Sequence, residues 1–219
     1  MISFSFSEML WTLVVATRWT VLLSALALSG GALVGGLLLI LRIQHSALIA
    51  RSAAGVIAFI QGTPLLIQLF LMFFGVAALG FNVNAWVAAT LTLVIWAGAF
   101  LGDIWRGCVE AIARGQWEAS ASLGMSWLQQ LRYIIFPQAI RIAIPATVGF
   151  SVQVIKATAL TSVIGFVELT RTAAFVSNAT YRPLMTYGLV AIIYFLLCWP
   201  LSLFAGWLAR RLNVANRTA

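Results

Sequence analysis

The segment Arg114-Gly-Gln-Trp-Glu-Ala-Ser-Ala-Ser-Leu-Gly124-Met-Ser-Trp-Leu-Gln-Gln-Leu-Arg-Tyr-Ile-Ile-Phe-Pro137 is the most informative stretch of the sequence. Residues 116–123 predict two helical turns, and Gly124 suits the left-handed residue that ends a helix. Ser126 is a favoured N-cap, and the glutamine at 129 completes a capping box. A second helix would then run to Phe136, because the residue before a proline disfavours helix. The segment therefore predicts two short helices joined by a sharp turn, which we call the knob.

Long apolar runs lie on both sides of the knob. A hydrocarbon core of about 30 Å takes about 20 helical residues. Runs of this length predict five membrane helices, the second interrupted by Gln-Gly-Thr-Pro at 61–64. We expect the helices at residues 17–42, 53–79, 84–105, 138–160 and 184–209, with the knob in a loop at 108–137. Residues 1–219 would then form one all-α integral membrane domain.

The composition excludes several classes of protein. Of the 219 residues, 63% are hydrophobic and 8% are charged, whereas a soluble domain is about 45–50% apolar and about 25% charged. A soluble enzyme of this size could not cover its surface with so few charged residues. The same apolar, charge-poor composition excludes a disordered chain. The net charge of +8 would suggest nucleic acid, but the cations lie between apolar runs. We therefore expect that the chain binds no nucleic acid and that lipid surrounds its helices.

The distribution of cations predicts the orientation. Cations accumulate on the cytoplasmic side of a membrane protein. The loops that five spans would place on the knob side carry nine of the 13 basic residues, namely Arg42, Arg51, Arg106, Arg114, Arg132, Arg141, Arg210, Arg211 and Arg217. The knob and the C-terminus are therefore expected in the cytoplasm, and the N-terminus outside.

The knob segment resembles the cytoplasmic EAA loop of ABC importer permeases. That pattern reads Glu-Ala-Ala, three residues, Gly, nine residues, Ile, one residue, Leu-Pro. The sequence departs from it by a serine at the second alanine and a phenylalanine at the leucine. In that family the loop docks in a groove of the ATPase subunit. The resemblance implies a type I importer fold and makes six residues candidates for coupling to the ATPase: Glu118, Ala119, Ser120, Gly124, Ile134 and Pro137.

Other stretches look like the polar amino acid permeases of the histidine, glutamine and arginine type. They are Gly-Thr-Pro-Leu at 62–65, Asp-Ile-x-Arg-Gly at 103–107, Lys-x-Thr-x-Leu at 156–160 and Glu-Leu at 168–169. This resemblance implies a multi-pass protein of the bacterial inner membrane. It also implies a second permease subunit, either a copy or a paralogue, two ATPase subunits and an extracytoplasmic amino-acid-binding protein.

Motifs for other chemistry are absent. The only lysine, Lys156, lies in no phosphate-binding loop, so we expect no cofactor on this chain, and ATP and Mg on a separate ATPase. No zinc-type cluster of Cys and His occurs. One alternative is an intramembrane serine protease using Ser151, which would need a base within reach, and the sole histidine is His45 in a distant loop. A structural membrane subunit is the other alternative.

Lys156 interrupts an otherwise apolar run. An unpaired cation at the bilayer centre costs about 2.5–3.5 kcal/mol or more. With Glu168 it could bind the two charges of an amino acid, or the two could pair as a structural brace; the lysine could also snorkel to the outer headgroups. The candidates for the substrate path are Lys156, Thr158, Thr161, Glu168, Gln61, Thr63 and Asp103.

Overall fold

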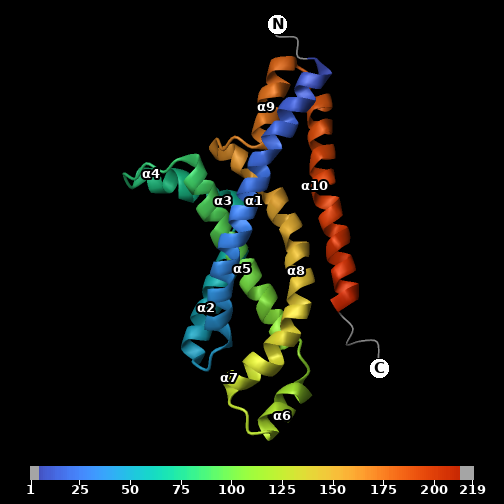
Figure 1. The fold of residues 1–219 in the computed structure, drawn as a ribbon. Helices are drawn as coiled ribbons and strands as arrows, with labels where there is room; N and C mark the ends of the chain where they lie inside the picture. Colours follow the sequence, from blue (N-terminus) through green and yellow to red (C-terminus); the bar gives the residue numbers. More distant parts are fainter. Residues whose placement is uncertain (1–4, 213–219) are drawn as a thin grey trace.

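A computed structural model describes residues 5–212, and within these residues every regular element is helical (Figure 1). Two segments, 71–75 and 130–135, are π-helical, and 158–164 is 3-10 helical. The α-helices are α1 (Phe6–Ile43), α2 (Ala47–Gly62), α3 (Leu65–Phe70), α4 (Val76–Ala78), α5 (Ala85–Glu110), α6 (Arg114–Ser122), α7 (Trp127–Gln129), α8 (Phe136–Ala157), α9 (Leu169–Thr180) and α10 (Pro183–Leu212).

The five predicted spans correspond to four long apolar helices and one bent pair. The four are 6–43, 85–110, 127–164 and 183–212, each longer than predicted. The predicted second span, 53–79, is broken at its Gln-Gly-Thr-Pro interruption: α2 and the helical arm at 65–78 meet at 98°. Thr63 and Pro64 are extended at this bend, because Pro64 supplies no backbone N–H to continue the ladder.

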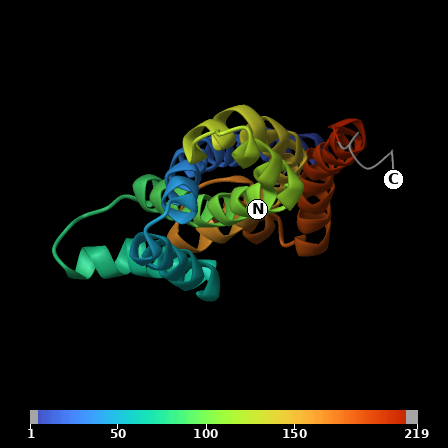
Figure 2. The same ribbon diagram turned by 90° about the horizontal axis from the view of Figure 1, so that it is seen from below.

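The bend sets the 65–78 arm at a steep angle to α2: Leu65 and Leu69 at its start are buried in the main core, and its far end leaves the bundle. In Figures 1 and 2 the arm projects from the side of the other helices. Its exposed side chains are apolar, with Leu71 and Phe74 both more than half exposed. This part of the chain therefore carries apolar surface that its own fold does not cover.

Four glycines bring the backbones of α1 and α5 into contact. A Cβ on Gly35 would lie 3.0 Å from the amide nitrogen of Gly102, and one on Gly31 would lie 2.8 Å from the Cβ of Ala97. A Cβ on Gly98 would lie 2.5 Å from a Val34 methyl. Small residues permit this close packing where helices have no hydrophobic drive to associate. The pair forms the axis of the bundle.

The knob lies at one end of the molecule. In Figure 1, α6 and α7 are at the bottom, α1 begins and α9 lies at the opposite end, and α10 ends toward the knob. The start of α1 and the end of α10 thus lie at opposite ends of the bundle, as an odd number of crossings requires. The side of the membrane that each end faces stays a prediction, and the predicted cytoplasmic Arg217 lies outside the described residues.

Candidate functional site

The knob consists of α6, a tight turn at Gly124, and α7 continued by the π-helical segment. Gly124 has φ +73°, the left-handed conformation that glycine adopts without a Cβ penalty. Its N–H donates to the Ala121 carbonyl at 2.9 Å. Ser126 and Gln129 form the capping box, with the Ser126 N–H donating to Gln129 Oε1 at 2.8 Å. The turn and the cap predicted from the sequence are therefore confirmed.

The second knob helix does not end before Pro137, which corrects the prediction. Phe136 is α-helical, with φ −60° and ψ −41°, and α8 continues directly from the π-helical segment. The N–H of Phe136 donates to the carbonyl of Leu131, five residues back. This wider turn puts Pro137 in the first turn of α8, where a missing N–H costs no helical hydrogen bond. The knob is therefore continuous with the membrane helix.

A small apolar core attaches the knob to the bundle. Val109, Ile112, Leu131, Ile135 and Ala139 are buried together, and Trp117 and Trp127 pack against them. The ring of His45, in the connection between α1 and α2, lies 4.7 Å from that of Trp127. The knob is thus fixed to α1, α5 and α8.

The six predicted coupling residues divide between this core and the free surface. Ser120 is buried, and its hydroxyl donates to the Trp117 carbonyl at 2.9 Å. Ile134 is half-buried against the core. Glu118, Ala119, Gly124 and Pro137 are exposed. Beside them, Leu123 is 80% exposed and Leu128 is 68% exposed. We call Glu118, Leu123, Gly124 and Leu128 the knob tip; its two leucines were not among the predicted residues.

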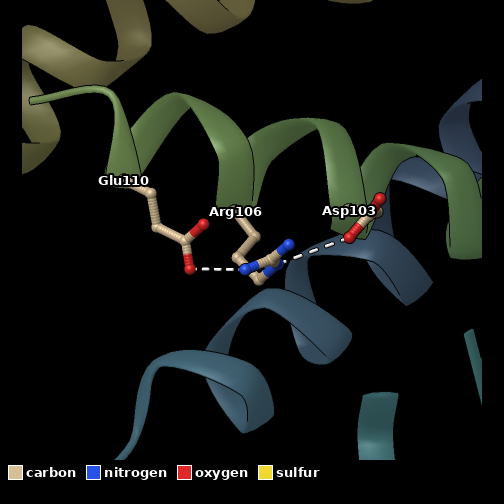
Figure 3. Close-up of polar contacts among 3 residues, drawn as sticks. All are labelled: Asp103, Arg106 and Glu110. Carbon is tan, nitrogen blue, oxygen red and sulfur yellow. Dashed lines mark hydrogen bonds and ion pairs between the residues drawn. The ribbon is translucent and has the colours of Figure 1, made fainter. Parts of the chain in front are cut away.

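Asp103 belongs to a charged row on α5. Figure 3 shows Arg106 between Asp103 and Glu110. Arg106 Nε lies 3.3 Å from Asp103 Oδ1, and Arg106 Nη1 pairs with Glu110. Because Asp103 already faces a cation on its own helix, its charge is compensated without a substrate.

Gln61 and Thr63 lie at the bend between α2 and the arm. Gln68 holds this bend: its side-chain nitrogen donates to the Ile60 carbonyl at 2.7 Å, to Thr63 Oγ1 at 2.8 Å and to the Thr63 carbonyl at 3.1 Å. These carbonyls have lost their helical donors at the break, so the amide satisfies groups that would otherwise be unpaired. Sequence reasoning did not assign Gln68 a role, although a glutamine four residues after a proline in an apolar run is a signal.

Glu168 is fully buried as the N-cap of α9. Its carboxylate accepts from the Arg171 N–H at 2.9 Å, from the Tyr194 hydroxyl at 3.1 Å and from the Thr20 hydroxyl at 3.3 Å. Burial raises the pKa of this carboxyl above its ordinary value, against these hydrogen bonds, which lower it. The carboxylate ties α9 to α1 and α10; Thr20 and Tyr194 were not predicted as its partners.

The structure does not form the predicted Lys156–Glu168 brace. Lys156 is exposed, and no acidic group of the described residues lies within 4 Å of it. Thr158 and Thr161 are buried, and their hydroxyls donate to the Ile155 and Thr158 carbonyls. Lys156 therefore stands apart from the other candidates in its stretch. It lines a groove together with aromatic side chains of α5 and α8.

The protease alternative finds no support in the geometry. The Ser151 hydroxyl donates to the Val148 carbonyl at 2.6 Å. The only histidine, His45, makes an edge-to-face contact with Trp127 in the knob. Among the described residues we therefore find no base for Ser151. The described residues also contain no cluster of three metal-ligating side chains.

Comparisons with known proteins identify relatives over most of the chain. The family described as "Binding-protein-dependent transport system inner membrane component" matches residues 28–214. The probable amino-acid ABC transporter permease YckA of Bacillus subtilis is 32% identical, over 88% of this chain and 85% of that protein. The glutamine transport system permease GlnP of Escherichia coli K12 is 32% identical, over 92% and 93%.

Solved structures show the same fold. A crystal structure of an amino acid ABC transporter with histidines matches with a TM-score of 0.89 and 33% identity, over 96% of this chain and 100% of that one. The inward-facing MetNI methionine ABC transporter matches with a TM-score of 0.79 at 16% identity, over 95% and 99%. The second likeness supports the fold alone.

Proposed function

Because the chain belongs to the family of binding-protein-dependent transport system inner membrane components, we propose that it forms the transmembrane pathway of an ATP-driven importer for amino acids. It is a permease subunit of an ABC importer in the bacterial inner membrane. Amino acids as the cargo are supported by the names of its relatives, which include amino-acid and glutamine permeases.

The assembly contains three further kinds of subunit. A second permease, identical or a paralogue, completes the pathway; the projecting, exposed 65–78 arm is consistent with such a neighbour. Two ATPase subunits hold ATP and Mg, and an extracytoplasmic binding protein delivers the amino acid. The knob faces the cytoplasm and the start of α1 faces outside, which is supported by the cations near the knob.

The knob is the observation that carries this proposal. Its tip combines an exposed carboxylate, Glu118, with two exposed leucines beside a rigid glycine turn. Leucines that are exposed on the knob, outside the predicted spans, are suited to a protein partner. In this proposal the ATPase receives the knob tip in a groove.

Coupling follows from the continuity of the helix. Residues 127–164 form one helical run from the knob to the stretch that carries Lys156. When the ATPase pair closes on ATP and displaces the knob, this run transmits the displacement into the membrane because a helix resists compression. The π-helical segment at 130–135 lies where the knob joins α8; such segments occur often at functional sites.

The substrate path runs past Lys156. Its ammonium group is exposed and is offered to the substrate carboxylate. Thr158, Thr161 and Glu168 are buried, so we assign them the support of this stretch rather than contact with substrate. Gln61 and Thr63 contribute through the bend that Gln68 holds.

Substitution of the knob tip tests the proposal. Burial of one leucine contributes about 1.5–3 kcal/mol, which is about 10- to 150-fold in affinity. Leu123→Asp and Leu128→Asp should each reduce co-purification with the ATPase subunit by at least about tenfold. The control is Leu184→Asp, at a leucine that is 90% exposed at the start of α10. Equal recovery of ATPase with all three variants would contradict ATPase docking at the knob tip.

A further inference from the structure

An apolar groove of about 550 Å³ lies between α1, α5 and α8, beside the core that attaches the knob. Its lining is hydrocarbon apart from the indole nitrogen of Trp105 and the hydroxyl of Thr147. These two groups bond within the protein: Trp105 Nε1 donates to Thr147 Oγ1 at 2.8 Å, and the hydroxyl donates to the Ala143 carbonyl at 2.7 Å. The apolar groove therefore offers its occupant hydrocarbon contacts.

The apolar groove is long enough for a lipid chain. Its lining on α8 runs from Phe136 to Val148, along one face of a helix that rises from the knob into the bundle (Figure 1). The 12 steps between these residues rise about 18 Å at about 1.5 Å each. One leaflet, half of a hydrocarbon core of about 30 Å, is about 15 Å deep. Ile140 and Ile144 on this face are 54% and 42% exposed, so a chain can enter the groove from the side.

A second cavity, of about 420 Å³, continues from the apolar groove toward the knob. Val109 lines both cavities, and on α1 the lining passes from Leu39 in the groove to Arg42, one turn further on. Arg114, at the start of α6, also lines this second cavity. Neither arginine lies within 4 Å of an acidic side chain of residues 5–212. We call this second space the basic cavity.

The one acid in the basic cavity is already compensated. Glu110 pairs with Arg106 on its own helix, so the cavity keeps a net positive charge. Trp117 and Trp127 line the same cavity, and tryptophan rings favour the level of the lipid headgroups. The basic cavity thus suits an anionic group at the surface of a membrane.

We propose that the apolar groove and the basic cavity together bind one anionic phospholipid. An acyl chain lies along α8 in the groove, and the anionic headgroup lies between Arg42 and Arg114. Guanidinium groups bind phosphate by strong charge-assisted hydrogen bonds. A phospholipid satisfies both cavities because it carries a charged end and a long apolar end in one molecule.

The bound lipid strengthens the attachment of the knob. The basic cavity is lined from α1, α5, α6 and α7, and the apolar groove adds α8. A lipid that fills both contacts the knob and three long helices at once. This inference requires that the helices lie in a membrane, and it does not depend on the cargo.

The test measures lipid binding to the detergent-purified complex of the permease with its ATPase, by native mass spectrometry. The probes are dioleoyl phosphatidylglycerol, which is anionic, and dioleoyl phosphatidylcholine, which has the same chains and no net charge. An arginine near an anionic lipid contributes about fivefold in affinity. Phosphatidylglycerol should therefore bind at least about tenfold more tightly than phosphatidylcholine, and Arg42→Gln combined with Arg114→Gln should remove this preference.

A matched control separates this site from overall charge. Arg210→Gln combined with Arg211→Gln removes the same two charges at the end of α10, outside the lining of both cavities. This variant should keep the preference for phosphatidylglycerol.

The acyl chain is tested separately from the headgroup. Ala143→Trp fills the apolar groove and leaves both arginines in place, so it should lower the affinity for phosphatidylglycerol at least about tenfold. Ala205→Trp, which is also half-buried but lies on α10, should not. Glycerol 3-phosphate carries the anion without the chains, and it should fail to displace the lipid from the wild type.

Each contrary result overturns the lipid site. Equal affinity for the two phospholipids would remove the role of charge, and an equal loss in the α10 control would make the preference a property of the whole surface. Displacement by glycerol 3-phosphate would assign the arginines to a small anion. A wild-type complex without phosphatidylglycerol, whose two permease subunits separate on Ala143→Trp, would assign the groove to the second permease. All of these results leave ATP-driven uptake, which is measured separately, intact.

Discussion

The turn at Gly124 makes the role of the knob open to a sharp test. Gly124 has φ +73°, and a Cβ built there meets nothing within 4 Å. Gly124→Ala therefore causes no clash, and its whole effect is conformational strain. An L-residue in the left-handed region costs about 1–2 kcal/mol, which changes a two-state ratio by about five- to thirtyfold. The variant should shift the knob toward a displaced arrangement by that factor.

Two further variants separate this strain from other effects. Asparagine tolerates the left-handed region better than alanine does, so Gly124→Asn should retain more function than Gly124→Ala. Gly115→Ala adds the same methyl group inside α6, where a Cβ also meets nothing within 4 Å. Because alanine favours a helix over glycine by about 0.5–1 kcal/mol, this control should not impair the knob.

The assay measures ATP hydrolysis by the full complex in nanodiscs, with and without the binding protein and an amino acid. Gly124→Ala should lower the affinity for the ATPase by up to about thirtyfold and reduce the stimulated hydrolysis accordingly. Gly115→Ala should behave as the wild type. If alanine, asparagine and glycine at 124 gave equal stimulation, the left-handed turn would have no part in coupling.

Three other predictions follow from the packing, the buried carboxyl and the orientation. The Cβ added by Gly98→Ala would lie 2.5 Å from a neighbouring side chain, so this variant should lower the free energy of unfolding by about 1–3 kcal/mol. Gly62→Ala, whose Cβ would meet nothing within 4 Å, should not lower it. Thermal unfolding in detergent compares the two variants. The raised pKa of Glu168 means that the folded protein holds this proton to higher pH than the unfolded chain does. The stabilisation from protonated Glu168 is complete below the pKa of the unfolded chain and is lost as pH rises through the pKa of the folded protein. The melting temperature of the wild type, relative to that of Glu168→Gln, should therefore fall as pH rises between these two pKa values. A difference in melting temperature that does not change with pH would refute this prediction. An impermeant thiol reagent on intact cells should label a cysteine introduced at Asn178 and not one at Ser122, and the reverse labelling would overturn the orientation.

Much of the fold was predictable because membrane insertion imposes length and hydropathy on the chain. The long uncharged runs became α1, α5, α8 and α10 with little error at their apolar centres. The knob was also predictable, since Gly124, Ser126 and the glutamine at 129 act locally through backbone conformation and capping. Capping and turn preferences suffice to predict a structure when the interacting residues are three or four positions apart in the sequence.

The errors arose where distant or non-standard contacts decide the structure. The π-helical turn that admits Pro137 into α8 follows no simple period. The 98° bend after α2 depends on the side chain of Gln68. The role of Glu168 depends on Thr20 and on a tyrosine 26 residues away. No spacing in a single sequence indicates such pairs, and of the alternatives left open for Lys156 the brace to Glu168 does not form.

ATP-driven uptake in proteoliposomes tests the central claim most directly. The complex of this permease with its ATPase and binding protein is reconstituted with ATP inside or outside, and entry of labelled amino acid is followed. We predict uptake that requires ATP on the ATPase side and that falls at least about tenfold with Leu123→Asp but not with Leu184→Asp. Uptake that is independent of ATP, or unaffected by the change at the knob tip, would contradict the account.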